Sequence, residues 1–249
     1  MVVHAFLWWF LICTLHPPIN VLANDEIVIA PGSSIQEAVN NAQAGSLILL
    51  KNGTYLEDSY PIIVNKTLTI RGENADSTII DGKNTDKGIF VVKSNGVRIA
   101  YLTVRNTFHN TFVPVAGVHL ADVENSEILN CIIEECMVGV LLKNSSNCIV
   151  ARNRIYNNSW GILLREECVS NIVMGNTILN NNIGLQIASP NCFSNSFYHN
   201  NFVNNTDQVV IRTSGYANFW DDGYPSGGNY WSDYAGVDDD GDGIGDTPY

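Results

Sequence analysis

The chain has 249 residues, of which 45% are hydrophobic and 15% are charged, and its formal net charge at pH 7 is −12. Eight aspartates and no lysine or arginine follow Arg212, so the tail alone supplies −8 of this charge. Acidity of this kind argues against nucleic acid as a partner, and the length suits a single domain.

The N-terminus has the features of an export signal. Residues 5–15 form a mostly apolar run that is too short to span a bilayer, and Val21-Leu22-Ala23 offers small residues for a signal peptidase. We therefore predict a signal peptide at residues 1–23 and an extracellular or cell-surface mature protein. The run lacks a basic flank, which leaves an uncleaved anchor as the alternative. No other segment predicts a membrane span, so export is the only membrane contact that we expect.

A short capping helix is expected near residue 35. Ser34-Ile35-Gln36-Glu37 has the form of a capping box, and Gly45 would end the amphipathic segment that follows. Strands are expected at residues 47–50, 62–64, 68–70, 79–80, 89–92 and 97–104, with Asn-Gly and Asp-Gly turns between them. The helix would cover the open end of the first coil.

One pattern is then repeated four times. Each copy opens with a glycine and an aliphatic strand, and these glycines recur at a nearly constant spacing: Gly117, Gly139, Gly161 and Gly184. The step from Gly88 to Gly117 is longer, so about six extra residues should bulge within residues 106–114. The period, the alternation of apolar residues and the frequent Asn and Gly predict solenoid coils. We therefore predict an all-β fold, a right-handed parallel β-helix over residues 24–212 with the capping helix at its start.

The repeat separates inward positions from outward ones. Three apolar columns should face the core: Val118/Val140/Ile162/Leu185, Leu120/Leu142/Leu164/Ile187 and Ile128/Val150/Val173/Phe197. The residues between the first two columns, His119, Leu141, Leu163 and Gln186, should face outward. Asn153, Asn176 and Asn200 follow the same period and should be buried at a bend, where stacked amides bond to one another. We predict a structural role for them.

Five cysteines lie outside the predicted signal peptide, so a complete disulfide framework is not indicated. Cys168 and Cys192 occupy equivalent places in successive coils, at a separation that a disulfide tolerates. The residues leave open whether this pair is linked or free. Cys131 takes the place of an asparagine in the column of Asn153 and should be buried.

Several short motifs resemble a known family. They are Ser-Ile-Gln-Glu-Ala-Val (34–39), Asn-Gly-Thr-Tyr (52–55), Leu-Thr-Ile-Arg-Gly-Glu-Asn (68–74) and Thr-Ile-Ile-Asp-Gly (78–82), followed by Asn-rich coils. Together they are similar to the NosD-type right-handed β-helix proteins, in the carbohydrate-binding and sugar-hydrolase (CASH) group of the pectin-lyase-like superfamily. The tail from Trp220 to Tyr234 resembles the ending of many archaeal surface members. The resemblance implies the fold more than any activity, because the shared residues are those that build coils.

The enzyme signatures of this superfamily are incomplete in this chain. The galacturonan hydrolases carry Asn-Thr-Asp, Asp-Asp, Gly-His-Gly and Arg-Ile-Lys on neighbouring coils. Here Asn84-Thr85-Asp86 falls in an early turn, Asp221-Asp222 lies beyond the repeats, and the other two motifs are absent. Two carboxylates serve one glycosidic bond only within about 10 Å of each other. Whether the protein is an enzyme therefore stays open.

A candidate ligand-binding face lies beside the Gly-led strands. His119, Asp122, Lys143, Arg165 and Glu166 fall there within two or three coils. One interpretation is a groove for an anionic or hydroxylated glycan, with His119, Asp122 and Arg165 as catalytic candidates if there is any catalysis. The other interpretation, which we favour, is a solvated face on which Lys143 and Arg165 pair with nearby acids.

The tail, residues 213–249, combines aromatic and acidic residues into a predicted C-terminal cap. Asp238, Asp240, Asp242 and Asp246 alternate around Gly243 as in calcium loops and resemble thrombospondin type-3 and dockerin loops, although position twelve is Tyr249 instead of an acid. We expect calcium to bind here, and a merely solvated acidic run is the alternative. The aromatic residues from Tyr216 to Tyr234 are expected to cover the last coil, and stacking of their faces on sugars is the alternative.

The resemblance to NosD also raises copper, but the five histidines and three methionines are scattered along the chain. We predict a monomeric exported module that contacts a polysaccharide or surface glycan without catalysis. The alternatives are a polysaccharide hydrolase, lyase or epimerase acting at the outer face, and a structural spacer on the cell surface.

Overall fold

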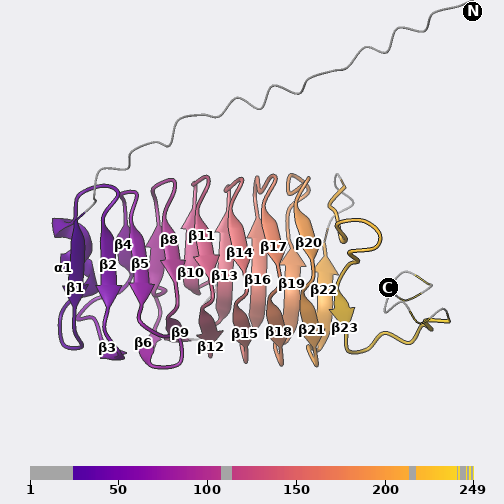
Figure 1. Cartoon of the computed structure of the whole chain (residues 1–249), viewed down its shortest axis with the longest axis horizontal. Helices are drawn as coiled ribbons and strands as arrows, with labels where there is room; N and C mark the ends of the chain where they lie inside the picture. The colour runs from indigo at the N-terminus through magenta and orange to yellow at the C-terminus, as the bar shows by residue number, and fades with distance from the viewer. Residues whose placement is uncertain are drawn as a thin grey trace, which may run out of the picture.

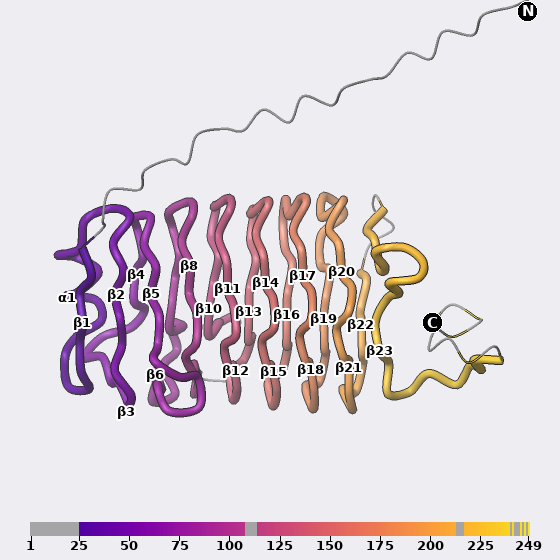
Figure 2. The backbone as a smooth tube through the Cα atoms, in the orientation of Figure 1, coloured from indigo at the N-terminus to yellow at the C-terminus, as the bar shows by residue number. Residues whose placement is uncertain are grey.

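The computed structural model describes residues 25–107, 114–212 and 217–239, together with 241, 245, 247 and 249. This part of the chain winds into a solenoid whose coils follow one another from the N-terminal to the C-terminal end (Figure 1). Figure 2 shows the coils stacked along one axis. No helix among these residues is long and apolar enough to cross a membrane. The predicted right-handed parallel β-helix is confirmed.

Three parallel sheets form the walls of the solenoid. Sheet A contains β1 (Glu26–Ile29), β2 (Leu47–Leu50), β5 (Thr69–Gly72), β8 (Arg98–Ala100), β11 (Glu127–Leu129), β14 (Ile149–Ala151), β17 (Ile172–Met174) and β20 (Ser196–Tyr198). Sheet B contains β3 (Gly53–Tyr55), β6 (Thr78–Thr85), β9 (Thr103–Thr107), β12 (Ile132–Glu134), β15 (Arg154–Tyr156), β18 (Thr177–Leu179), β21 (Asn201–Val203) and β23 (Tyr230–Trp231). Sheet C contains β4 (Ile62–Val64), β7 (Phe90–Val92), β10 (Ala116–Ala121), β13 (Val138–Lys143), β16 (Trp160–Arg165), β19 (Ile183–Ile187) and β22 (Asp207–Ile211).

The predicted inner columns are present in register. Val140 of β13 pairs with Val118 below it and with Ile162 above it, and Val150 of β14 pairs with its predicted partners in the same way. The members of all three columns are at most 1% exposed and belong to one continuous core. Because each column repeats one residue per coil, the core is long and narrow.

The early coils differ from the predicted strands. The single strand expected at 97–104 is divided into β8 and β9, because Tyr101 between them has a left-handed φ of 56°. Strands β1 and β3 were not predicted. The bulge expected within residues 106–114 falls mostly on residues 108–113, which lie outside the described part of the chain. The register shows that this coil has extra residues, because Thr103 is separated from its partner Ile132 by more residues than Ala116 is from its partner Val138. The extra residues therefore lie between Thr103 and Ala116.

Buried asparagines form three ladders that run along the solenoid. The first contains the predicted Asn153, Asn176 and Asn200 and continues to Asn229. In each rung the side-chain oxygen accepts hydrogen bonds from the backbone N–H and the side-chain amide of the rung before it; from Asn153 to Asn176 these bonds measure 2.9 and 3.0 Å. The sequence reasoning missed the second ladder, Asn158/Asn181/Asn205, and the third, Asn171/Asn195/Asn218. Because these amides are satisfied, their burial carries no large penalty.

A cysteine precedes the first asparagine of each ladder. The backbone N–H groups of Cys131, Cys136 and Cys148 donate to the side-chain oxygens of the first ladder asparagines, at 2.9–3.0 Å. The burial predicted for Cys131 is confirmed. All five cysteines of the described chain are buried free thiols. The side chains of Cys168 and Cys192 lie close enough to interact, and the two thiols are free.

The glycine that opens each repeated strand is needed because the next coil approaches closely. A Cβ atom on Gly161 would lie 2.5 Å from the carbonyl oxygen of Gly184, and one on Gly139 would lie 2.6 Å from that of Gly161. Only glycine fits against a backbone at this distance. The period that revealed the solenoid is therefore a packing requirement.

The capping helix α1 (Ile35–Asn41) buries Ile35, Ala38 and Val39 against the first coil. Only half of the predicted capping box forms: Ser34 Oγ accepts from Glu37 N at 3.1 Å, and the buried Glu57 accepts from Ser34 Oγ at 2.7 Å. Lys66 donates to the carbonyls of Asn40 and Ala42 at the other end of the helix. The helix ends before Ala42, which is extended, so the expected stop at Gly45 is wrong.

Aromatic residues cover the last coil. Trp220 stacks on Phe197 with ring centroids 4.6 Å apart, and Trp231 stacks on Phe202 at 4.5 Å. Tyr249 stacks on Trp231 at 4.3 Å. Both tryptophans pack against the core, which is the covering role expected of this segment.

Candidate functional site

The candidate site lies on the outer side of the bend between sheet C and sheet A. Strands β10, β13 and β16 end in succession, and the next residue in each coil has a left-handed φ: 57° at Asp122, 47° at Asn144 and 61° at Glu166. Asp and Asn tolerate this conformation better than most residues. The bend therefore places a polar side chain at the same corner of three successive coils.

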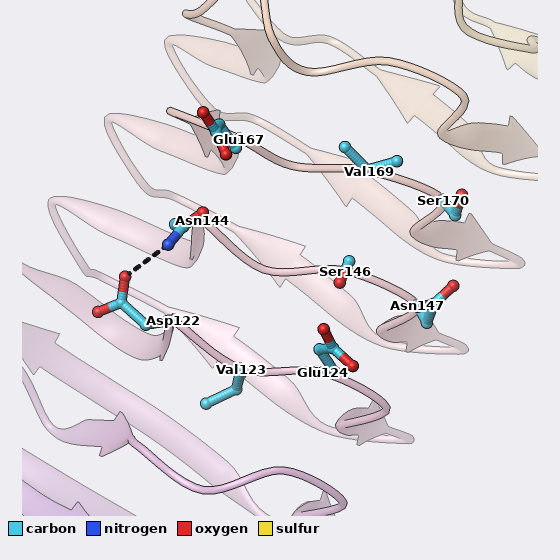
Figure 3. Close-up of a pocket in the computed structure, with 9 residues that line it drawn as sticks. All are labelled: Asp122, Val123, Glu124, Asn144, Ser146, Asn147, Glu167, Val169 and Ser170. Atoms are coloured by element: carbon cyan, nitrogen blue, oxygen red, sulfur yellow. Dashed lines mark hydrogen bonds between the residues drawn. The ribbon is translucent and has the colours of Figure 1, made fainter.

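Most of the predicted polar residues at this corner have partners. Lys143 Nζ lies 3.3 Å from Glu166 Oε1. Asn144 Nδ2 donates to Asp122 Oδ1 at 3.0 Å, the dashed contact in Figure 3. Among the described residues, no ion pair joins Arg165 to a carboxylate. Lys143 thus behaves as expected of a solvated face, and its charge is balanced locally.

His119 is poorly suited to carry a proton at neutral pH. Burial lowers its pKa from 6.5 to about 4, and the positive charge of Lys143 adds to this shift, while Asp122 opposes it. Its Nε2 atom is buried without a hydrogen-bond partner among the described residues. The side chain is therefore neutral at pH 7.

The middle of the outward column that begins at His119 is buried, unlike a solvated face. Leu141, Leu163 and Gln186 were expected to face solvent, but they are only 3%, 4% and 6% exposed. The two leucines belong to an apolar cluster separate from the main core, and Trp160, which packs against this cluster, donates its indole N–H to Gln186 Oε1 at 2.8 Å. The polar, accessible part of the face is therefore confined to its edge at the bend.

A groove opens at this edge, with a volume of about 430 Å³. It is lined by residues of three successive coils: Asp122, Val123, Glu124, Asn144, Ser146, Asn147, Glu167, Val169 and Ser170 (Figure 3). The lining comprises three carboxylates, two amides, two hydroxyls and two valines. This volume is in the usual range of ligand-binding clefts.

One additional residue in the third coil shapes the groove. Lys143 pairs with Arg165 before the bend, and Ser146 pairs with Val169 after it. The sequence separation within the Ser146–Val169 pair is one residue longer than that within the Lys143–Arg165 pair. The bend of this coil is therefore one residue longer than the bend before it. Glu167 lies in this longer bend and contributes to the groove wall.

The structure keeps only part of the predicted site together. Of the predicted residues, Asp122 lines the groove, whereas His119, Lys143, Arg165 and Glu166 are not among its lining residues. The sequence reasoning missed Glu124, Asn144, Asn147 and Glu167. The lengthening of the repeat between these coils was the available signal for Glu167.

Three of the four candidate calcium ligands, Asp240, Asp242 and Asp246, lie outside the described residues. Asp238 is described, and its Oδ1 accepts from Gly241 N at 2.8 Å. Elsewhere in the described chain, no three His, Cys, Asp or Glu side chains are grouped so that they could hold a metal ion.

Solved structures with the same architecture include proteins that are found with sugars. The chain is similar to a pectate lyase from Bacillus sp. N165 in complex with trigalacturonate (15% identity, TM-score 0.55, covering 84% of this chain and 80% of that one). It is also similar to the catalytic domain of a GH87 α-1,3-glucanase in complex with nigerose (20%, 0.55, 86% and 39%) and to ORF18 of Geobacillus virus E2 (16%, 0.60, 71% and 42%). The chain thus spans less than half of the viral protein. At these identities the likeness concerns the fold.

The fold defines a pectin-lyase-like parallel β-helix protein. The chain belongs to the NosD family, whose model, described as periplasmic copper-binding protein (NosD), matches residues 20–236. No curated protein sequence matches the chain.

The described residues do not fit the copper centre that the family description suggests. Copper is held by His, Cys and Met side chains. Here the described cysteines are all buried, and burial raises the pKa of the Cys131 and Cys136 thiols to about 12. His119 is partly buried and its pKa is lowered by Lys143, and His199 contacts Ser226 and Asp222.

Proposed function

We propose that this protein is an exported, monomeric module that contacts carbohydrate without catalysis, and that the groove at the bend between sheets C and A is the contact site. The observation that carries the proposal is the groove itself, about 430 Å³ in volume and lined by carboxylates, amides and hydroxyls from three coils. Such groups hydrogen-bond readily to the hydroxyls of a sugar.

Two further observations support a binding role over an enzymatic one. The pKa of His119 is about 4, which is far from the value that suits a general base or acid at neutral pH. The enzyme signatures of related folds are also incomplete in the sequence. The presence of bound sugars in proteins of similar fold agrees with carbohydrate contact.

The proposal is tested by glycan-array retention of the intact protein and a groove variant. Glu124 and Glu167 are exposed and have ordinary backbone conformations, so Glu124→Ala with Glu167→Ala should leave the coils intact. Each lost hydrogen bond costs about 0.5–1.5 kcal/mol, so we expect affinity to fall about tenfold. Glu26→Ala with Glu37→Ala, two exposed acids far from the groove, is the matched control.

The outcomes separate the three candidate functions. Retention that depends on Glu124 and Glu167 supports the module. New reducing ends or unsaturated products from a polysaccharide panel would instead identify an enzyme. The absence of retention on every glycan would leave the structural spacer as the function.

A further inference from the structure

The groove that we propose as the contact site is lined by negative side chains and by no positive ones. Asp122, Glu124 and Glu167 supply three carboxylates, and none of the nine lining residues is Lys or Arg. Of the two cations that end β13 and β16, Lys143 is paired with Glu166 and Arg165 is in no ion pair among the described residues, and neither lines the groove. The charge that meets a ligand in the groove is therefore negative.

This lining is also dominated by hydrogen-bond acceptors. An ionised carboxylate accepts hydrogen bonds and donates none. The amide of Asn144, which has N–H groups to donate, already gives one to Asp122. A ligand that satisfies the three carboxylates of the groove must therefore donate hydrogen bonds to them.

We infer that the groove selects glycans without acid groups, such as neutral glucans or amino-sugar polymers, and rejects polyuronides. The inference rests on the proposed function, because it concerns the same groove. A sugar hydroxyl or ammonium group donates to the three carboxylates. A uronate carboxylate has no proton to donate and is repelled by charges of its own sign. The selectivity is thus opposite to what a trigalacturonate ligand would require.

Retention of the intact protein on four immobilised glycans tests the selectivity: an α-glucan, a β-glucan, chitosan oligosaccharides and polygalacturonate, each in EDTA and in millimolar calcium. We expect retention on at least one of the first three to exceed retention on polygalacturonate at least tenfold. Any residual retention on polygalacturonate should rise with ionic strength, because salt screens the repulsion.

A charge variant gives a second readout. In Glu124→Gln with Glu167→Gln, two negative charges are removed while the side-chain shape is kept. The ratio of polygalacturonate retention to neutral-glycan retention should rise at least tenfold. Glu26→Gln with Glu37→Gln, which changes net charge equally at a distance from the groove, should leave this ratio as it is in the wild type.

The results distinguish this inference from the proposed function. Polygalacturonate retention equal to or greater than neutral-glycan retention, in EDTA or in calcium, would overturn the inference and leave the carbohydrate module standing. If polygalacturonate is retained this strongly in calcium but not in EDTA, the groove carboxylates hold a calcium ion that bridges them to the uronate groups. No retention of the wild type on any glycan would overturn both.

Discussion

Removal of one ladder asparagine should destabilise the solenoid far more than removal of an exposed one. Asn176 is fully buried in the middle of the first ladder. Its Oδ1 accepts from the backbone N–H and side chain of Asn153, and its Nδ2 donates to the carbonyl of Val150 and to Asn200 Oδ1. Asn176→Ala removes all four bonds.

The magnitude follows from the groups that lose a partner. The backbone N–H of Asn153 loses its acceptor, and the carbonyl of Val150 loses the Asn176 donor, both in a buried bend. Each buried polar group left without a partner costs about 1–3 kcal/mol. The Val150 carbonyl still faces the paired strand β17 and loses one of its donors, which costs about 0.5–1.5 kcal/mol, so we expect Asn176→Ala to lower the free energy of unfolding by about 2–4 kcal/mol.

Chemical denaturation of the purified protein measures this loss. Asn182→Ala is the control, because Asn182 lies at the surface and an exposed substitution changes stability by only about 0.5 kcal/mol. Hydrogen exchange of the Asn153 backbone N–H should also be faster in Asn176→Ala and unchanged in Asn182→Ala. If the two variants have the same free energy of unfolding, the ladders do not hold the coils together as argued.

Three further predictions concern other parts of the chain. The pKa of His119 is about 4 in the folded protein and 6.5 ordinarily, so the unfolded chain binds the proton first as the pH falls. The wild type should therefore lose up to about 3 kcal/mol of stability between pH 6.5 and pH 4. Denaturation curves of His119→Leu, in which the new side chain matches Leu141 and Leu163 in the following coils, should lack this loss. Oxidation of the native protein with a small-molecule disulfide should link Cys168 to Cys192, whose side chains interact across successive coils, and peptide mapping without reduction identifies the link. Calorimetry should detect calcium binding to the tail at millimolar ion, and Asp238→Asn should weaken it.

Each of these has its own contrary result. An equal loss of stability on acidification in wild type and His119→Leu would assign the acid sensitivity to other groups. Mapping that finds a link between any other cysteines, or five free thiols after oxidation, would contradict the contact between Cys168 and Cys192. Calcium heat that is absent from the intact protein would leave the tail as a solvated acidic segment.

The coil architecture was predictable because one physical constraint repeats in every turn. The column of Gly117, Gly139 and Gly161 appears at a fixed spacing since each glycine must accept the backbone of the next coil. The ladder of Asn153, Asn176 and Asn200 repeats at the coil period because each side-chain amide bonds to the amide one coil away. The second and third ladders carry the same period, so they too were predictable from the sequence.

Other features depend on contacts that no period reveals. Glu57 and Lys66 bind the two ends of α1, but each lies far along the chain from most of its partners, and nothing in its local sequence marks the contact. Leu141 and Leu163 alternate with core residues and were therefore assigned to solvent. Their burial depends on side chains that pack beside them on the outer face.

The sequence by itself determined which residues become vertical neighbours, since a stacked coil admits only side chains and turns that repeat in register. The tertiary structure decided the groove, its charge and the pKa of His119. Those properties arise where one longer bend meets two shorter ones, and where burial and neighbouring charges from several coils act on the same atoms.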